Sequence, residues 1–415
     1  MITDDNKKLA QWAMEYALKN GCQAAKLVLY TNSNSSFELR DGKMDRLQQS
    51  TENGLGLNLY VDGRFGSFST NRLDKKELET LITNGIESTR YLAVDESRML
   101  ADPARYYKGG KPDLQLFDKK LYEVNPDDKV AIARAAAEEV LGKDERIISV
   151  DSSYSDGEGS SYRLISNGFE GESKSTWFSV SASVSIKGEG EARPQDYWYD
   201  SALFYDKLTK TGIGAKALER VLRKLGQKKA KSGKYTMVVD PMNVGNLLSP
   251  MLSALYGSAL QQKNSFLMDK LDTKVASDLF TLREPHAIGA NGSRYFDNEG
   301  VATEPRTVFD KGVLKTYFID TYNGKKMDIA PTISTPSRLI LTPGDKDLNG
   351  LVADIKQGIL VTGFNGGNSN SSTGDFSYGI EGFLIEDGKL TQPVNEMNVT
   401  GNMVTLWNSL VAVGN

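Results

Sequence analysis

Apolar residues recur at helical spacing near the N-terminus and then alternate with polar residues over a long stretch. We expect a helix that begins after Thr3 and ends at Gly21, with a second helix after Asp74 and Glu77, which form a capping box. Between them, alternation predicts strands, with hairpin turns at the Asp-Gly pairs of residues 41–42 and 62–63. The apolar side of the first helix carries Leu9, Trp12, Ala13, Tyr16 and Ala17.

The same order of elements returns further along the chain. Periodicity fades from Ala93 to Asn125, which predicts a linker, and Asn125 with Pro126 then marks the start of a helix. A strand (IISVDSSY), a hairpin (SSYRLISNGFEG) and a long alternating strand (TWFSVSASVSIKG) follow. The order of helix, strand, hairpin and strand therefore appears twice, which predicts a repeated topology.

The last part of the chain is rich in short apolar runs and glycine turns. It begins with the strand KYTMVVD and continues into a Met- and Leu-rich helix predicted over residues 244–260, whose apolar side should be buried. We therefore predict an α+β protein, with two helix-strand-hairpin regions followed by a β-rich domain built around a central helix. The predicted boundaries are 1–105, 106–230 and 231–415.

Composition excludes several classes of function. The 50 Lys and Arg residues nearly balance the 54 Asp and Glu residues, for a net charge of −4, so nucleic acid is an unlikely partner. No apolar run approaches the ~20 residues that span a membrane, and the charged N-terminus is unlike a secretory signal, so we expect a cytoplasmic protein. Cys22 and His286 are the only cysteine and histidine, which rules out a His-pair metal motif. We expect Cys22 to be a buried small residue and His286 to be structural or on the surface.

Two charged stretches have competing interpretations. Seven cationic side chains between residues 220 and 234 suggest a phosphate-binding patch, but cations also favour a helix C-terminus, and that interpretation is stronger. The acids Asp151, Asp156 and Glu158 in DSSYSDGEG lack the spacing of a calcium loop, and a solvated turn is the favoured interpretation.

Two glycine-punctuated segments contain the best candidates for chemistry or binding. GSRYFDNEGVATE carries Arg294, Asp297 and Glu299, and GDFSYGIEG carries Asp375, Ser377 and Tyr378. Paired carboxylates can act as acid and base, yet the same residues are common in turns, and GDFSYG does not fit a serine-hydrolase elbow. We predict these six residues to be substrate-binding or interface residues, and we assign no catalytic residue.

With these segments, the chain resembles the TldD/TldE family, also called PmbA or "modulator of DNA gyrase". The matching stretches are GLGLNLYVDGRFGSFSTNRLD, FDNEGVATEPRTVFDKGVLKTYFIDTYNGKKMD and TGDFSYGIEGFLIEDGKLTQPVNEMNVTGNM with LVAVGN at the end. The resemblance implies a heteromeric zinc metalloprotease that cleaves peptides and small unfolded proteins. Only the TldD branch carries the metal, on a helix with the motif HExxxH.

In this chain the metal motif of that helix is absent. Aligning LL before the motif and NSFL after it places Ser249, Pro250 and Ala254 where the first His, the Glu and the second His would stand. The chain thus resembles the TldE/PmbA branch, which implies no metal here, zinc in a TldD-like partner, and a heterodimer. Two alternatives stay open: a homodimeric peptide-binding module without peptidase activity, and a regulator of DNA gyrase.

Overall fold

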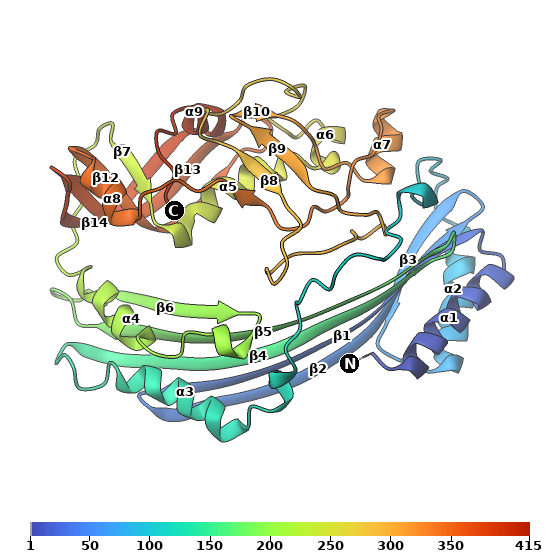
Figure 1. The fold of residues 1–415 in the computed structure, drawn as a ribbon, viewed down its shortest axis with the longest axis horizontal. Coiled ribbons are helices and arrows are strands. Elements are labelled where there is room, and N and C mark those ends of the chain that lie inside the picture. Colours follow the sequence, from blue (N-terminus) through green and yellow to red (C-terminus); the bar gives the residue numbers. More distant parts are fainter. Residues whose placement is uncertain (1) are drawn as a thin grey trace. The chain divides into compact units, whose positions relative to one another are not determined.

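The computed structural model describes residues 2–415 and divides into two compact units, shown as a ribbon in Figure 1. The N-terminal unit comprises Met1–Ile186, Gln195–Glu219 and His286–Thr303. The C-terminal unit comprises Lys187–Pro194, Arg220–Pro285 and Glu304–Asn415. None of the helices among the described residues is both long enough and apolar enough to cross a bilayer.

The N-terminal unit is built on one six-stranded antiparallel sheet with the order β3-β2-β1-β4-β5-β6. Its elements repeat the order helix, three strands, helix, which confirms the predicted repeat. The two halves join where β1 pairs antiparallel with β4. The elements are α1 (Asp4–Lys19), β1 (Ala24–Arg40), β2 (Lys43–Val61), β3 (Arg64–Thr70), α2 (Lys75–Thr89), α3 (Pro126–Glu138), β4 (Ile147–Ile165), β5 (Phe169–Ile186), β6 (Gln195–Ala202) and α4 (Ile213–Leu222).

The strands of this sheet are much longer than the predicted ones. β1, β2, β4 and β5 have 17 to 19 residues each, against about 5 to 6 in an average strand. Polar stretches that separate the apolar runs, such as residues 31–36, continue the ladder because both neighbouring strands pair with them without interruption. Residues 41–42 and 62–63 form the turns as predicted, with Asp41 and Asp62 in the left-handed region at φ 51° and 50°.

Helices α1 and α2 cover one face of the β1 to β3 half of the sheet, and Figure 1 shows them side by side there. Thr3 caps α1 through the backbone N–H of Asn6, and Asp74 caps α2 through that of Glu77. The apolar side of α1 lies in a core with Leu27 and Leu57 from the sheet. Cys22 is buried beside this core, as the sequence predicted, and burial raises the pKa of its thiol.

The C-terminal unit contains two four-stranded sheets. One has the order β14-β13-β12-β7, in which β7 runs parallel to β12, and the other has the order β10-β9-β8-β11. This β-rich organisation with interspersed helices agrees with the predicted fold class. The strands are β7 (Thr236–Val239), β8 (Leu282–Glu284), β9 (Arg306–Asp310), β10 (Val313–Leu314), β11 (Ile340–Leu341), β12 (Gln357–Ser369), β13 (Asp375–Glu386) and β14 (Lys389–Asn402). The helices are α5 (Val244–Ser253), α6 (Gly257–Gln261), α7 (Thr321–Met327), α8 (Leu348–Ala353) and α9 (Met403–Asn408).

The central helix predicted over residues 244–260 is not continuous, and that part of the prediction is wrong. It ends at Ser253, and α6 starts at Gly257, because the intervening backbone bonds to Phe318. The Phe318 N–H donates to the Leu255 carbonyl at 2.9 Å, and the Gly257 N–H donates to the Phe318 carbonyl at 2.8 Å. Those long-range bonds replace the helical ones.

The apolar side of the broken helix is buried, as the sequence predicted. Leu247, Met251 and Leu255 pack in a core with Phe280, just before β8, and Phe309 of β9. Burying a Leu or Met side chain contributes about 1.5 to 3 kcal/mol, so this core fixes α5 against the sheets.

Candidate functional site

Helix α5 carries the positions at which the resemblance implies a metal site. The chain enters it from β7 through a short turn that Asp240 caps, accepting a hydrogen bond from the Met242 N–H at 2.9 Å. Ser249 is exposed, Pro250 is partly buried within the helix, and Ala254 is 1% exposed at its end. The local fold of a strand running into a helix is therefore present, as expected from the sequence.

The side chains at these positions do not fit a zinc ion. A catalytic zinc needs three protein ligands, usually His, Cys or carboxylate, and Pro250 and Ala254 have no donor atom in their side chains. The Ala254 side chain lies in the apolar core, and its carbonyl accepts a hydrogen bond from the Ser265 hydroxyl at 2.6 Å. Residues 2–415 contain no group of three or more His, Cys, Asp or Glu side chains placed to share a metal.

Arg294, Asp297 and Glu299 lie in a loop that belongs to the N-terminal unit. Asp297 is 2% exposed, and its Oδ1 accepts hydrogen bonds from the N–H groups of Glu299 and Val301 at 2.8 and 2.9 Å. Glu299 is also buried and forms an ion pair with Lys26 at 3.6 Å. The structure thus uses both carboxylates to hold the loop, which is the turn role that the sequence left open for them.

The same loop lines a pocket of about 520 Å³ in the N-terminal unit. Arg294 and Asp297 contribute to it together with Arg163, whose guanidinium donates to the Asn298 carbonyl at 2.9 Å. Burial lowers the pKa of Arg163. Tyr295 stacks on Tyr107 with ring centroids 5.3 Å apart. This pocket is polar and aromatic.

Asp375, Ser377 and Tyr378 lie on β13 in the C-terminal unit, so the two predicted groups belong to different units. Asp375 and Ser377 are exposed, and Tyr378 is partly buried against Phe364 and Phe376. Hydrogen bonds from the Asn402 amide at 2.9 Å and the Thr373 hydroxyl at 2.8 Å lower the pKa of Asp375.

The basic run begins at Arg220 in the last turn of α4, which is the helix C-terminus that the favoured interpretation predicted. Arg220 pairs with Asp240 at 3.3 Å, Lys224 pairs with Glu381 at 2.7 Å, and Arg223 lies over the Phe383 ring at 4.8 Å. Arg220 and Lys224 thus bond to the residue after β7 and to β13, within the C-terminal unit. Both cations are largely buried and charge-paired, so they are not available to a phosphate.

The acids of DSSYSDGEG are also placed differently from the prediction of a solvated turn, which is wrong. They lie in the middle of β4, where Asp156 and Glu158 are buried. Asp156 forms an ion pair with Lys129 of α3 at 2.6 Å, and Glu158 accepts a hydrogen bond from the Tyr122 hydroxyl at 2.5 Å. Sequence reasoning missed this cluster because Lys129 is distant along the chain.

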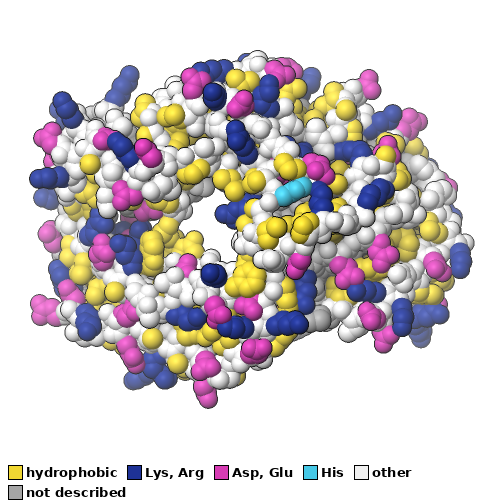
Figure 2. Space-filling model, viewed as in Figure 1, with side chains coloured by type: hydrophobic (Ala, Val, Ile, Leu, Met, Phe, Trp, Pro, Cys, Tyr) yellow, Lys and Arg dark blue, Asp and Glu magenta, His cyan; other side chains and the backbone are white. Residues whose placement is uncertain are grey.

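The face of the molecule drawn in Figure 2 shows no extended field of one sign. Figure 2 shows cationic and anionic side chains interspersed over the visible face, with the single histidine among them. The His286 Nε2 lies 3.0 Å from the Thr303 carbonyl oxygen, and the ring meets Tyr295 edge-on. This environment is the structural or surface one that the sequence favoured.

Three domain models of one known family match most of the chain. Residues 25–89 match the PmbA/TldA metallopeptidase domain 1, residues 119–225 the central domain, and residues 232–415 the C-terminal domain. The metalloprotease PmbA homolog of Haemophilus influenzae is 28% identical, over 98% of this chain and 90% of its own length.

Solved structures agree with that assignment. A Bacteroides thetaiotaomicron protein described as a modulator of DNA gyrase is 72% identical, with a TM-score of 0.98 over 100% of this chain and 95% of that one. TldE of Thermococcus kodakarensis shares the fold at 19% identity, with a TM-score of 0.83 over 98% of this chain and 93% of its own. The chain therefore belongs to the PmbA/TldD metallopeptidase family, in its PmbA/TldE branch.

Proposed function

We propose that this chain is the non-catalytic subunit of a cytoplasmic two-chain zinc metallopeptidase that processes peptides and small unfolded proteins. A TldD-like partner would supply the zinc. The proposal depends on the residues of α5. The helix follows β7 and packs in the apolar core, but Ser249, Pro250 and Ala254 stand at the positions of the two zinc ligands and the base. A family member with this helix can shape a substrate site but cannot activate water by the zinc mechanism.

The environment of α5 supports a scaffolding role. Ala254 lies in the apolar core, where a histidine would have to displace packed neighbours. Pro250 lacks the backbone N–H that residues in a helix interior donate, and a proline there costs about 3 kcal/mol of helix stability. Position 250 therefore differs from a glutamate base in its backbone as well as in its side chain. Positions five residues apart on a regular helix also diverge by about 140°, so local distortion would be needed for both to meet one ion.

The test is reconstitution with the TldD-like chain of the same organism. Each chain alone and the mixture are assayed on an unstructured peptide, with and without a chelator, and zinc is measured by elemental analysis. We expect chelator-sensitive cleavage from the mixture, with zinc retained by the partner alone. A zinc ion held stoichiometrically by this chain, or chelator-sensitive cleavage by this chain free of partner, would contradict the proposal.

A matched variant examines the role of the helix. Ser249→His with Pro250→Glu and Ala254→His restores the residue types of the motif, and we expect it to bind no zinc stoichiometrically, because two ligands on a regular helix do not complete a site. The control is Ser249→His alone, which changes an exposed residue. Tight zinc binding by the triple variant would show that the scaffold needs only the missing side chains.

One observation favours the second candidate, a homodimeric peptide-binding module without peptidase activity. β14 is an edge strand of its sheet, and open edges accept further strands. Light scattering of the isolated chain separates the two: a stable homodimer that does not exchange with the TldD-like chain would favour the module.

A further inference from the structure

The outer edge of β14 is paired at one residue near its middle and is unpaired over residues 397–401 within the described part of the chain. Lys228 pairs with Val394 in a parallel bridge, in which its N–H donates to the Pro393 carbonyl at 3.1 Å and its carbonyl accepts from the Asn395 N–H at 3.4 Å. Within residues 2–415, no strand pairs with the outer side of residues 397–401. One residue of the chain therefore already pairs with this edge, and the five consecutive residues 397–401 keep their outer side unpaired within residues 2–415.

A bulge explains why the chain's own segment stops there. Glu396 has a left-handed conformation with φ 51°, at a point where the β13 to β14 register shifts. Beyond it, the Ala230 N–H donates to the Met397 sulfur at 3.3 Å rather than to a backbone carbonyl. Residues 229–233 therefore leave the edge.

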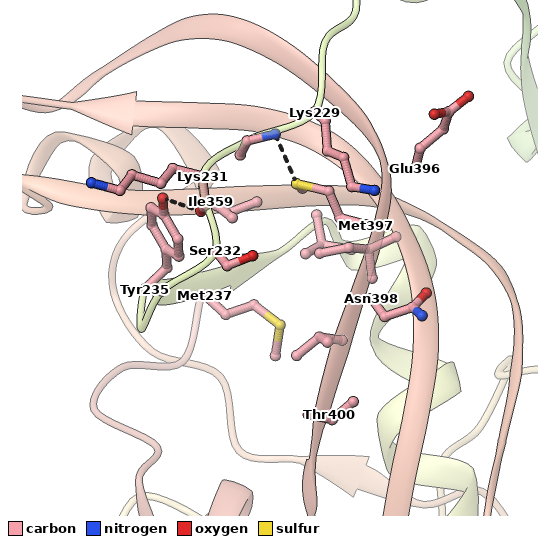
Figure 3. Close-up of a pocket in the computed structure, with 15 residues that line it drawn as sticks. Lys229, Lys231, Ser232, Tyr235, Met237, Ile359, Glu396, Met397, Asn398 and Thr400 are labelled. Carbon is pink, nitrogen blue, oxygen red and sulfur yellow. Dashed lines mark hydrogen bonds between the residues drawn. The ribbon is translucent and has the colours of Figure 1, made fainter.

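The space between that segment and the sheet is a pocket of about 470 Å³, drawn in Figure 3. Its apolar lining includes Met237, Ile359, Val361 and Ile380 from β7, β12 and β13. Residues 396–400 of β14 line it without a gap. Because successive side chains of a strand point to opposite faces, a pocket that touches five in a row also reaches the backbone edge.

Two lysines line the segment side of this pocket without an acidic partner. Lys229 and Lys231 have no carboxylate within 4.0 Å among the described residues, whereas Lys224, just before them, is paired with Glu381. Figure 3 shows both lysines on the segment that borders the pocket, with Glu396 on the strand side. The charge available to a ligand on the segment side is therefore positive, which complements acidic side chains.

We propose that the open edge of β14 and this pocket bind an extended peptide by strand addition, with apolar side chains in the pocket and acidic side chains at Lys229 and Lys231. The inference rests on the proposed function only in taking peptides as the ligand, and it gives the non-catalytic subunit a peptide site of its own. Five residues of strand span about 17 Å, so the ligand is a segment of about five residues in which apolar and acidic residues alternate.

The experiment measures binding of labelled pentapeptides to the isolated full chain by fluorescence anisotropy. The probe is fluorescein-Glu-Val-Glu-Val-Glu-amide, compared with the same peptide carrying Lys in place of Glu and with a version methylated on alternate backbone nitrogens. We expect the acidic peptide to bind, and Lys229→Glu with Lys231→Glu to weaken it by about tenfold while improving the Lys peptide. Methylation should also weaken binding by about tenfold, because strand addition uses those N–H groups.

The control is Lys43→Glu with Lys143→Glu, which reverses two charges outside the pocket and should leave the affinity unchanged. The idea is overturned by equal affinity in the Lys229 and Lys231 variant, by indifference to methylation, or by no binding up to about 1 mM. Concentration-dependent protection of the 397–401 amides from hydrogen exchange without peptide would overturn it too, because a second copy would then occupy the edge. No partner or zinc takes part, so failed reconstitution of peptidase activity would refute the proposed function while leaving this result intact.

Discussion

The buried pair of Lys129 and Asp156 allows a stability prediction whose size can be worked out from the structure. The two side chains are 9% and 3% exposed and lie 2.6 Å apart. Asp156 also accepts hydrogen bonds from the hydroxyls of Ser35 and Tyr154, and the Lys129 ammonium donates to Ser35 at 3.2 Å. Burial and the Asp156 carboxylate together raise the pKa of Tyr154, so this phenol remains a neutral donor.

Removing one member of the pair leaves the other as an unpaired buried charge. This lowers the free energy of unfolding by about 3 to 5 kcal/mol. Lys129→Met leaves Asp156 with two hydroxyl donors, so we expect about 3 kcal/mol. Asp156→Asn leaves the ammonium beside the rings of Phe37 and Tyr154, at 5.8 and 5.9 Å, and we expect about 4 kcal/mol.

The double variant Lys129→Met with Asp156→Leu removes both charges and should come within about 2 kcal/mol of the wild type.

The assay is urea unfolding followed by tryptophan fluorescence. Trp12, Trp177 and Trp198, three of the four tryptophans, belong to the same unit as the pair. Arg40→Ala is a suitable control, because its ion pair with Asp151 is exposed and should contribute at most about 1 kcal/mol. Losses below about 1 kcal/mol in both single variants would refute the reasoning, since water would then reach the pair.

Three further predictions concern the C-terminal unit. Gly312→Ala should prevent stable folding, because φ is +77° and a Cβ would lie 1.9 Å from the Ala276 carbonyl oxygen. The control is Gly142→Ala, where φ is +74° but the space around a Cβ is open. Thermal unfolding should show a loss of only about 1 kcal/mol of unfolding free energy in this control. Met251→Ala should lower the unfolding free energy by about 2 to 5 kcal/mol, since the side chain is fully buried; an unchanged urea midpoint would show that α5 is not packed as described. Asn402→Ala removes the main donor that lowers the pKa of Asp375, so this pKa should rise toward its ordinary value in a carbon-13 NMR titration of the carboxyl; no change would mean that the hydrogen bond is absent in solution.

Local sequence signals were sufficient for the helix starts and the hairpin turns. Thr3, Asp74 and Asn125 cap helices within three residues of themselves, and the Asp-Gly turns need only their own backbone freedom. Ser249, Pro250 and Ala254 cannot supply three zinc ligands in any fold, so the sequence alone excludes a site built from those positions. Each of these conclusions depends on a residue and its near neighbours.

Only the tertiary structure decided which polar residues are buried and where elements end. Asp156 is an internal residue of β4 because it pairs with Ser35 of β1, which is more than a hundred residues earlier in the chain, and because Lys129 covers it. A local sequence pattern contains neither contact. The helix predicted over residues 244–260 breaks because Phe318 bonds to its backbone, and residues 286–303 cluster with the N-terminal unit although they follow α6 in the chain. The open edge of β14 is likewise invisible in sequence, because whether a strand lies at an edge depends on what every other strand pairs with.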